Sequence, residues 1–282
     1  KSFSERFSGY PVTVENLSRL TQSKSKEILK SIKKGTADLV IGTHRLLSED
    51  VEFKDLGLLI IDEEQKFGVK AKEKLKKKKE NVDVLTLTAT PIPRTLNLAL
   101  LGIREISIID TPPVNRIPII TEVISGTDEE IRNAILRELS RDGQVFYIYN
   151  EVKKINYKLD ELKKILPDFV KLEYIHGQLP PKEIKDKLKR FEEGKFDVLV
   201  ASTIIENGID VSNANTILIE KFTNMGLSQV YQLRGRVGRS NRQVYCYLLK
   251  RGNITAKGKK KEETMHKVEG IKSGGFQISM ED

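Results

Sequence analysis

Tryptophan is absent from the 282 residues, and the chain has only one cysteine and three histidines. A single cysteine, Cys246, excludes a disulfide within the chain and is typical of a reducing cytoplasm, where we expect this protein to work. The three histidines show no zinc-site spacing among themselves or with Cys246. We therefore expect no metal site built from nitrogen and sulfur ligands.

Long apolar runs are missing as well. No stretch approaches the roughly 20 residues of a transmembrane helix, and the first residues contain no apolar core of a signal peptide. We therefore expect no membrane partner. The chain begins without methionine and in the middle of a fold pattern, which indicates a piece of a longer protein.

Positive charge is in excess, with 49 Lys and Arg against 40 Asp and Glu and a net charge of +9. A basic surface of this kind favours a polyanionic partner such as nucleic acid. The alternative is that the lysines only keep the surface soluble. As a prior, 282 residues indicate about two domains.

The stretch that organises the prediction is a run of four apolar residues at 58–61 followed by three acids. The run is too short for a helix and is typical of a strand buried on both faces of a parallel sheet. At the carboxyl end of such a strand, the chain enters the crevice where α/β folds bind ligands. Asp62 can hold Mg²⁺ through water there, and Glu63 can activate a water against a nucleotide phosphate. Alone, the stretch also fits a strand followed by a solvated acidic turn.

Strands alternate with helices in two series, which predicts two parallel α/β sheets. The first series has an amphipathic helix at 24–34 that ends at Gly35. Its strands are expected at 38–43, 58–61, 84–90 and 105–110. A stiff linker with three prolines follows at 111–118.

The second series opens with a strand at 119–124 and a capping box, Thr127 to Glu130, that begins a helix. Its other strands are expected at 145–149, 172–175, 197–201, 216–219 and 244–249. The domains are therefore predicted at 1–112 and 113–250, with a separate segment at 251–282.

Three further segments carry candidate chemistry. Thr88 to Thr90 places two hydroxyls at a strand end, although threonine is also simply common in strands. The segment 202–210 follows another strand and supplies hydroxyls, a glycine and a carboxylate. The segment 232–239, Gln-Leu-Arg-Gly-Arg-Val-Gly-Arg, presents three arginines, which grip phosphate with paired hydrogen bonds. A surface cluster that only contacts DNA is the alternative for this last segment.

Together, in this order, the segments resemble the motifs of the superfamily 2 helicases and translocases. Asp-Glu-Glu-Gln at 62–65 is similar to motif II and Thr-Ala-Thr at 88–90 to motif III. The segment 202–210 is similar to motif V, and 232–239 matches the Q-x-x-G-R-x-G-R pattern of motif VI. This resemblance covers residues 1–250 and implies two RecA-like domains that clamp ATP between them.

Within this superfamily, the chain resembles the bacterial transcription-repair coupling factors. The residues that carry this resemblance are Phe-Gly-Val at 67–69, Thr-Pro-Ile-Pro-Arg-Thr-Leu at 90–96 and Thr-Pro-Pro-Val-Asn-Arg at 111–116. The RecG-type fork-remodelling helicases are the nearest alternative. The tail at 274–282 resembles the start of the translocation motif that both families share.

The resemblance implies a role for each matched residue. Asp62 would coordinate Mg²⁺ through water, and Glu63 would activate the attacking water. Arg236 and Arg239 would reach the γ-phosphate of ATP from the second domain, and Gln232 would line the same interface.

Other matched residues would sense nucleotide or touch DNA. Thr88 and Thr90 would couple the nucleotide state to domain movement, and Gly208 and Asp210 would sense nucleotide from the second domain. The residues expected at the DNA phosphate backbone are Gly42, Thr43, His44, Ser202 and Thr203.

The sequence departs from the family where the P-loop should be. No G-x-x-x-x-G-K-[S/T] occurs in the chain, so we expect the P-loop upstream and part of the first sheet uncovered. Ser202 and Asn207 stand where threonine is expected.

The expected function of the intact parent is ATP-driven movement on double-stranded DNA during transcription-coupled repair. RNA polymerase and excision-repair proteins would bind regions outside this chain. By itself, this chain would hydrolyse little ATP because it lacks the P-loop. An alternative of another class is a non-catalytic DNA-binding scaffold.

Overall fold

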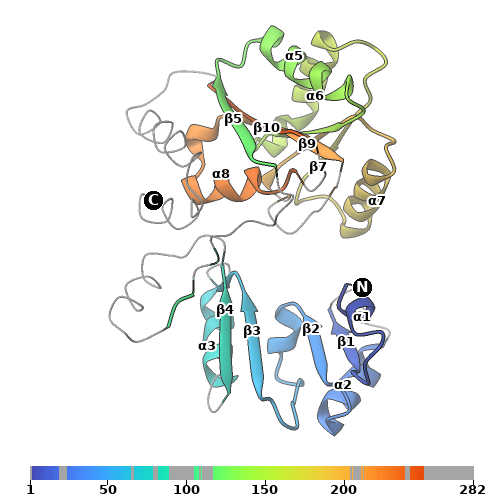
Figure 1. Ribbon diagram of the computed structural model, residues 1–282, viewed down its shortest axis with the longest axis vertical. Coiled ribbons are helices and arrows are strands. Elements are labelled where there is room, and N and C mark those ends of the chain that lie inside the picture. The colour runs from blue at the N-terminus through green and yellow to red at the C-terminus, as the bar shows by residue number, and fades with distance from the viewer. Residues whose placement is uncertain are drawn as a thin grey trace. The chain divides into compact units, whose positions relative to one another are not determined.

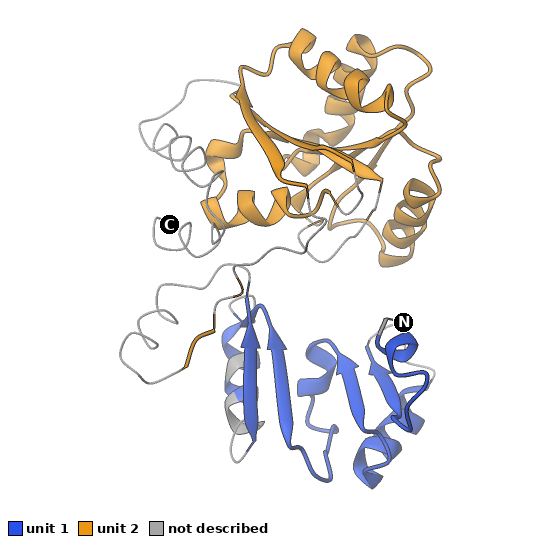
Figure 2. Cartoon of the chain, viewed as in Figure 1, with its two compact units in different colours: residues 1–89 blue, residues 90–282 orange. Residues whose placement is uncertain are grey.

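The computed structural model describes residues 2–18, 24–64, 67–78, 82–88, 105–107, 109, 117–203, 205, 211, 213–238 and 242–250. The chain divides into two compact units, residues 1–89 and 90–282 (Figure 2). Both contain helices and parallel strands, which confirms the predicted α/β class. The predicted linker residues 111–116 and the segment 251–282 lie outside the described residues. No described helix is both long and apolar enough to cross a membrane.

The described part of unit 1 has two separate pairs of parallel strands (Figure 1). β1 (Val14–Leu17) pairs with β2 (Leu39–Gly42), and β3 (Leu58–Asp62) pairs with β4 (Asp83–Leu87). The helical elements are α1 (Ser2–Arg6), α2 (Ser25–Lys34), the 3₁₀ turn η2 (His44–Leu47) and α3 (Val69–Lys78). Sequence reasoning missed β1, whose Val-Glu-Asn-Leu has too few apolar residues to stand out.

Helix α2 confirms the predicted helix and its end. Ile28 and Ile32, one turn apart, are its buried residues and pack with Leu17 and Val51. Gly35 adopts a left-handed conformation with φ of 74°, and its N–H donates to the carbonyl of Ile32 at 3.1 Å. A residue with a side chain is strained in that conformation, so glycine ends the helix here.

The apolar run at 58–61 is not buried on both faces, so that prediction is wrong. Successive strand residues point to opposite faces, and Ile61 is buried against Leu75 of α3. Leu58 and Ile60, on the other face, are 55% and 53% exposed. The described residues place no helix over that face. This exposure agrees with the expectation that part of the first sheet is uncovered.

Unit 2 contains a six-stranded parallel sheet with the strand order β5-β10-β9-β6-β8-β7. The strands are β5 (Ile119–Ile124), β6 (Gln144–Ile148), β7 (Leu172–Ile175), β8 (Val198–Ala201), β9 (Ala214–Glu220) and β10 (Val244–Leu249). The helical elements are α5 (Asp128–Leu139), η4 (Val152–Lys154), α6 (Ile155–Ile165), α7 (Pro181–Glu192), η6 (Phe222–Asn224) and α8 (Leu227–Arg234). Every strand predicted for the second series is present.

Helices cover both faces of this sheet, which is why its central strands are largely apolar. Val145 and Tyr147 of β6 point into a cluster with α5 and α6. Phe146 and Ile148 of the same strand point into the opposite cluster with α7 and α8 (Figure 1). The predicted capping box begins α5: the backbone N–H of Glu130 donates to Thr127 Oγ1, and that of Thr127 donates to the Glu130 carboxylate.

The strand predicted at 105–110 is wrong where the structure describes it. Residues 105–107 and 109 form no strand. Ile109 is 93% exposed. A strand requires a hydrogen-bonded neighbour, and the alternating apolar pattern of this segment could not show whether one is present.

The interior of unit 2 also holds paired charges. Glu138 is fully buried, forms an ion pair with Arg141 and accepts a hydrogen bond from Thr216 Oγ1 at 2.5 Å. Gly143 lies against this group, since a Cβ there would stand 1.7 Å from Glu138 Oε1. Burying a carboxylate is tolerated only when it is paired in this way.

We expect Gly143→Ala to destabilise unit 2 by about 3 kcal/mol, because the added methyl displaces the buried carboxylate from its partners. Chemical denaturation followed by far-ultraviolet circular dichroism measures this change. Gly177→Ala is the matched control, since a Cβ at Gly177 meets no atom within 4 Å. Equal stability of the two variants would show that Glu138 moves aside freely.

Candidate functional site

The acid pair of unit 1 stands at the carboxyl end of β3, beside the end of β4. Asp62 is in register with Leu87, and the N–H of Glu63 donates to the carbonyl of Leu87 at 2.9 Å. Thr88 follows directly, so the structure brings the acids of the predicted motif II next to the first threonine of motif III. The Asp62 side chain is exposed, and that of Glu63 is partly exposed. The parallel pairing of the two strands therefore positions these groups at one edge.

Glu63 has an unusual backbone conformation. Its φ is 51°, in the left-handed region that residues other than glycine, asparagine and aspartate seldom adopt. Such a conformation costs about 1–2 kcal/mol for a residue with a Cβ. It turns the chain sharply at the strand end, so Glu63 does not continue the strand direction of Asp62. Strain of this kind is concentrated at functional sites.

The acids fit a magnesium ion that keeps most of its water. Carboxylate oxygens are the ligands that Mg²⁺ prefers, and it is usually bound by one or two carboxylates with water and phosphate. Among the described residues, no group of three or more His, Cys, Asp or Glu side chains is arranged to hold a metal. The exposed carboxylate of Asp62 fits a contact to Mg²⁺ through water.

The predicted DNA-contact residues of unit 1 are the last residue of β2, Gly42, and the two residues that follow it. A Cβ on Gly42 would stand 2.3 Å from the carbonyl oxygen of Leu17, so close approach of the neighbouring strand alone requires glycine here. Thr43 is exposed and precedes η2 in an extended conformation. The His44 ring lies 4.6 Å from that of Phe67, whose N–H donates to the carbonyl of Glu64. His44 therefore contacts the turn that follows the acid pair.

In unit 2, the predicted motif V begins where β8 ends. Ser202 is buried, with 7% of its surface exposed, and its N–H donates to the carbonyl of Ile175 at 3.2 Å. Thr203 is partly exposed, and its N–H donates to Asn150 Oδ1 at 3.2 Å. Thr203 is thus the more accessible of the two predicted DNA contacts.

The predicted motif VI spans helix α8 and the turn after it. Gln232 lies in the helix, and the N–H of Arg236 in the turn donates to the carbonyl of Leu233 at 3.0 Å. Gly238 has a φ of 85°, and a Cβ there would stand 2.6 Å from Val244 Cγ2 of β10. The turn that carries Arg236 is therefore held tightly against the sheet.

Several predicted site residues lie outside the described residues. They are Thr90, Gly208, Asp210 and Arg239. Their roles, and the roles given to the described residues, stay predictions.

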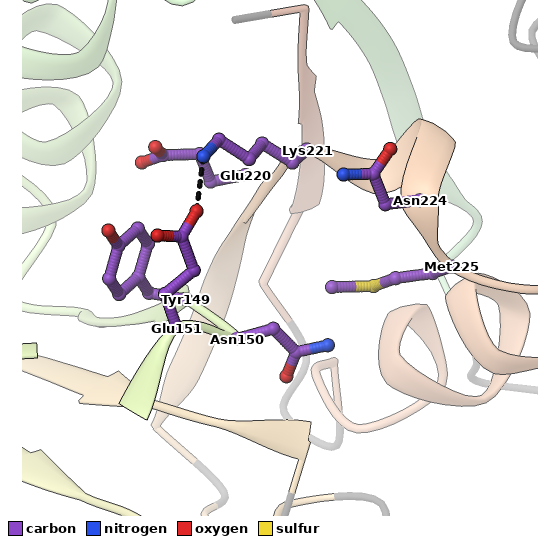
Figure 3. A pocket seen from close by; sticks show the side chains of 7 residues that line it. All are labelled: Tyr149, Asn150, Glu151, Glu220, Lys221, Asn224 and Met225. Atoms are coloured by element: carbon purple, nitrogen blue, oxygen red, sulfur yellow. Dashed lines mark hydrogen bonds and ion pairs between the residues drawn. The ribbon is translucent and has the colours of Figure 1, made fainter. Parts of the chain in front are cut away.

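Sequence reasoning missed a group of polar residues around a pocket in unit 2. The pocket lies between the segments that follow β6 and β9 (Figure 3). Glu151 forms an ion pair with Lys221 across it and another with Lys154 at 2.9 Å. Asn150 and Asn224 line the same pocket. Asn150 directly follows an apolar run, as Asp62 does, but the sequence does not indicate which residues it contacts.

The ion pair across the pocket controls the ionisation of Glu151. Its hydrogen bond with Lys221, and then that with Lys154, lower the pKa of the Glu151 carboxyl from its ordinary 4.5 to about 2. Because the pKa is lowered in the folded state, the stabilisation is present above pH 4.5 and is lost as the pH falls through 2.

We expect Lys221→Met to raise the pKa of Glu151 toward 4.5, with Lys154 retaining part of the effect. Carboxyl ¹³C chemical shifts, followed by nuclear magnetic resonance from pH 6 to a pH well below the pKa of about 2 in the wild type, measure this change. Lys153→Met, on the same turn as Lys154, is the control, because the ion pairs of Glu151 are with Lys154 and Lys221. An unchanged pKa in Lys221→Met would contradict the ion pair.

Comparison with known proteins assigns both units to helicase families. Residues 1–99 match the DEAD/DEAH box helicase family, and residues 128–241 match the helicase conserved C-terminal domain. The structure of RecG bound to a three-way DNA junction superposes with a TM-score of 0.75 and 36% identity, over 99% of this chain and 37% of that one. Both units therefore match helicase domains.

The curated relatives indicate a more specific similarity within the helicases. The chain is 50% identical to the transcription-repair-coupling factor of Bacillus subtilis over 285 residues, which is 100% of this chain and 24% of that protein. It is 48% identical to that of Staphylococcus haemolyticus, again over 24% of the relative. The chain therefore spans about a quarter of these relatives. These helicase similarities confirm the resemblance read from the motifs.

More distant helicase structures share only the fold. S. cerevisiae Dbp5 bound to RNA and ADP BeF3 has a TM-score of 0.61 at 13% identity. A structural similarity at this low sequence identity supports the α/β fold of the two units but gives no information about their substrate.

Proposed function

We propose that this chain is the central part of the ATP-driven motor of a longer parent protein, which moves along double-stranded DNA during transcription-coupled repair. The observation that carries the proposal is the acid pair at the end of β3, joined to the end of β4 by the Glu63 N–H. The 50% identity to a transcription-repair-coupling factor supports the role in repair. The proposed domains remain 1–112 and 113–250, with the start of a translocation motif at 251–282.

In this proposal ATP is the substrate and Mg²⁺ accompanies it. Mg²⁺ neutralises charge on the phosphates when it is bound. Asp62 holds the ion through water, and Glu63 accepts a proton from the attacking water. Arg236 and Arg239, with Gln232 at the same interface, would stabilise the negative charge on the γ-phosphoryl group while its bond to ADP breaks and its bond to water forms.

The remaining proposed roles concern nucleotide sensing and DNA. Thr88, Thr90, Gly208 and Asp210 report the nucleotide state. Exposed Thr43 and His44 and partly exposed Thr203 suit contacts to phosphate, which carry no sequence information. Contacts of this type suit a motor that moves over any sequence. RNA polymerase and excision-repair proteins are the proposed partners of other regions of the parent, on the basis of the relatives' name.

A fork-remodelling helicase is the second candidate function. It is favoured by the structural similarity to RecG, which was solved on a three-way DNA junction. A non-catalytic DNA-binding scaffold is the candidate from another class. A scaffold would bind DNA with an affinity that falls steeply as the salt concentration rises, and this affinity would not change when nucleotide is added.

The test is DNA-stimulated ATP hydrolysis by this chain and by a parent protein that also carries a P-loop. The 282 residues contain no G-x-x-x-x-G-K-[S/T], so the phosphates lack their main cradle. We expect hydrolysis by the parent to be stimulated by duplex DNA and hydrolysis by this chain to be negligible. A parent that binds duplex DNA but hydrolyses no ATP would favour the scaffold, and full activity of this chain alone would contradict the proposed site.

A further inference from the structure

The start of the segment 202–210 is held in unit 2 by three different kinds of contact. The backbone N–H of Ser202 continues the sheet by donating to Ile175 of β7 at 3.2 Å. The side chain of Ile205 is fully buried in the cluster beneath α7 and α8. Between them, the N–H of Thr203 donates to the side chain of Asn150 at 3.2 Å.

Asn150 occupies the point where the backbone hydrogen bonds between β6 and β8 end. The last of these bonds runs from the N–H of Tyr149 to the carbonyl of Ala201 at 2.9 Å. One residue further on, the Asn150 side chain supplies the acceptor that a strand would otherwise provide. Asn150 is exposed and lines the pocket of Figure 3, so it contributes little to the core.

The neighbouring charges hold the segment that carries Asn150. Glu151 is bonded to Lys221 and Lys154, and Lys221 follows Glu220 at the end of β9. Glu220 is buried, 3.0 Å from Lys158 and 2.5 Å from the Tyr147 hydroxyl. The backbone of Asn150 is therefore fixed on both sides, by β6 before it and by this ion-pair network after it.

We propose that Asn150 is a positioning residue that acts through Thr203. Its Oδ1 holds the backbone of Thr203 so that this residue, directly after Ser202, is in place before DNA binds. The proposal rests on the proposed function, because it takes the segment 202–210 to be the one that contacts DNA and senses ATP. Asparagine suits the role because a short side chain with a carbonyl oxygen readily accepts a hydrogen bond from nearby backbone.

The first experiment measures the hydrogen bond itself, in the 282-residue chain. Amide hydrogen exchange of Thr203, resolved to single residues, is compared between the wild type, Asn150→Ala and Asn150→Asp. We expect exchange to become about fivefold faster in Asn150→Ala, from the usual worth of one hydrogen bond, and to return close to the wild-type rate in Asn150→Asp. The amide of Tyr149 is the internal reference, and Asn224→Ala in the same pocket is the control that leaves Thr203 unchanged.

The second experiment measures the consequence in the parent protein, as the DNA dependence of ATP hydrolysis. We expect Asn150→Ala to raise the DNA concentration for half-maximal stimulation about fivefold, with a smaller change in kcat, because a loosened segment must be ordered on binding. Asn150→Asp keeps the acceptor and is expected to lie nearer the wild type. If the amide nitrogen of Asn150 instead donated to phosphate, Asn150→Asp would bind DNA no better than Asn150→Ala.

Each outcome decides the proposal. Unchanged Thr203 exchange in Asn150→Ala overturns it, and so does faster exchange without any change in DNA dependence. A failure of Asn150→Asp to improve on Asn150→Ala also overturns it. A different result would contradict the proposed function itself: ATP hydrolysis by the wild-type parent that does not respond to DNA.

Discussion

Replacing Glu63 with glutamine is expected to lower DNA-stimulated ATP hydrolysis by the parent protein by about 10²–10⁴-fold, the usual contribution of a general base. Glutamine keeps the size and shape of the side chain but cannot accept a proton from the attacking water. It also preserves the backbone turn, since the φ of 51° is no harder for glutamine than for glutamate. DNA binding should remain, because the side chain is assigned to the water and not to phosphate of DNA.

The matched control is Glu64→Gln, one residue further along the same turn. It removes the same charge, and the proposal gives Glu64 no part in proton transfer. Phosphate release at saturating ATP and duplex DNA measures both variants. A comparable loss in Glu64→Gln would mean that acidity of the turn matters and not the position of Glu63, and an active Glu63→Gln would remove Glu63 from the chemistry.

Replacing Arg236 with alanine is expected to lower the same rate by about 10³-fold, the lower range for an arginine that stabilises a transferring phosphate. The turn that carries Arg236 is fixed by the bond from its N–H to Leu233 and by Gly238 against Val244. A fixed turn keeps the backbone of Arg236 in one position, so the side chain starts from a defined place. The predicted loss is in kcat, measured by ATP hydrolysis, with unfolding of the variant followed in parallel.

Arg242→Ala is the control for Arg236→Ala. Arg242 lies after the Q-x-x-G-R-x-G-R pattern and donates a hydrogen bond to the carbonyl of Arg141, so it has a structural contact. Its replacement should leave kcat within a small factor of the wild type. Full activity of Arg236→Ala in a folded protein would contradict the role proposed for motif VI.

The central strands of unit 2 could be predicted from the sequence because both of their faces are covered. Runs such as 145–148 and 244–249 are apolar throughout, and this pattern survives whatever their neighbours are. The capping box at Thr127 and Glu130 could also be predicted, because its hydrogen bonds join residues only three positions apart and do not depend on the rest of the fold.

The first series of strands was harder to predict because burial there depends on residues that the local pattern does not reveal. The run at 58–61 has the composition of a doubly covered strand, yet Leu58 and Ile60 face outward. The segment 105–110 alternates like a strand but has no strand partner where it is described. In both cases the local pattern indicates what a residue prefers, and only the rest of the fold determines whether that preference is met.

The candidate site also contains residues that could be predicted from the sequence and one that could not. Asp62, Glu63 and Thr88 could be found because polar residues at the ends of parallel strands meet at one edge. Asn150 was missed because its role is a single bond to Thr203, 53 residues away, which no local motif records. Side chains that hold a backbone segment across a sheet are visible only in three dimensions.

The most direct measurement of the central claim is ATP-driven displacement of a third DNA strand from a linear duplex by the parent protein. A motor that moves along double-stranded DNA pushes such a strand off, whereas a protein that only binds does not. We predict displacement with ATP, none with a non-hydrolysable analogue and none with Glu63→Gln. Intact duplex binding and ATP hydrolysis without displacement would contradict movement along the duplex, and unwinding of forked DNA under those conditions would favour the fork-remodelling alternative.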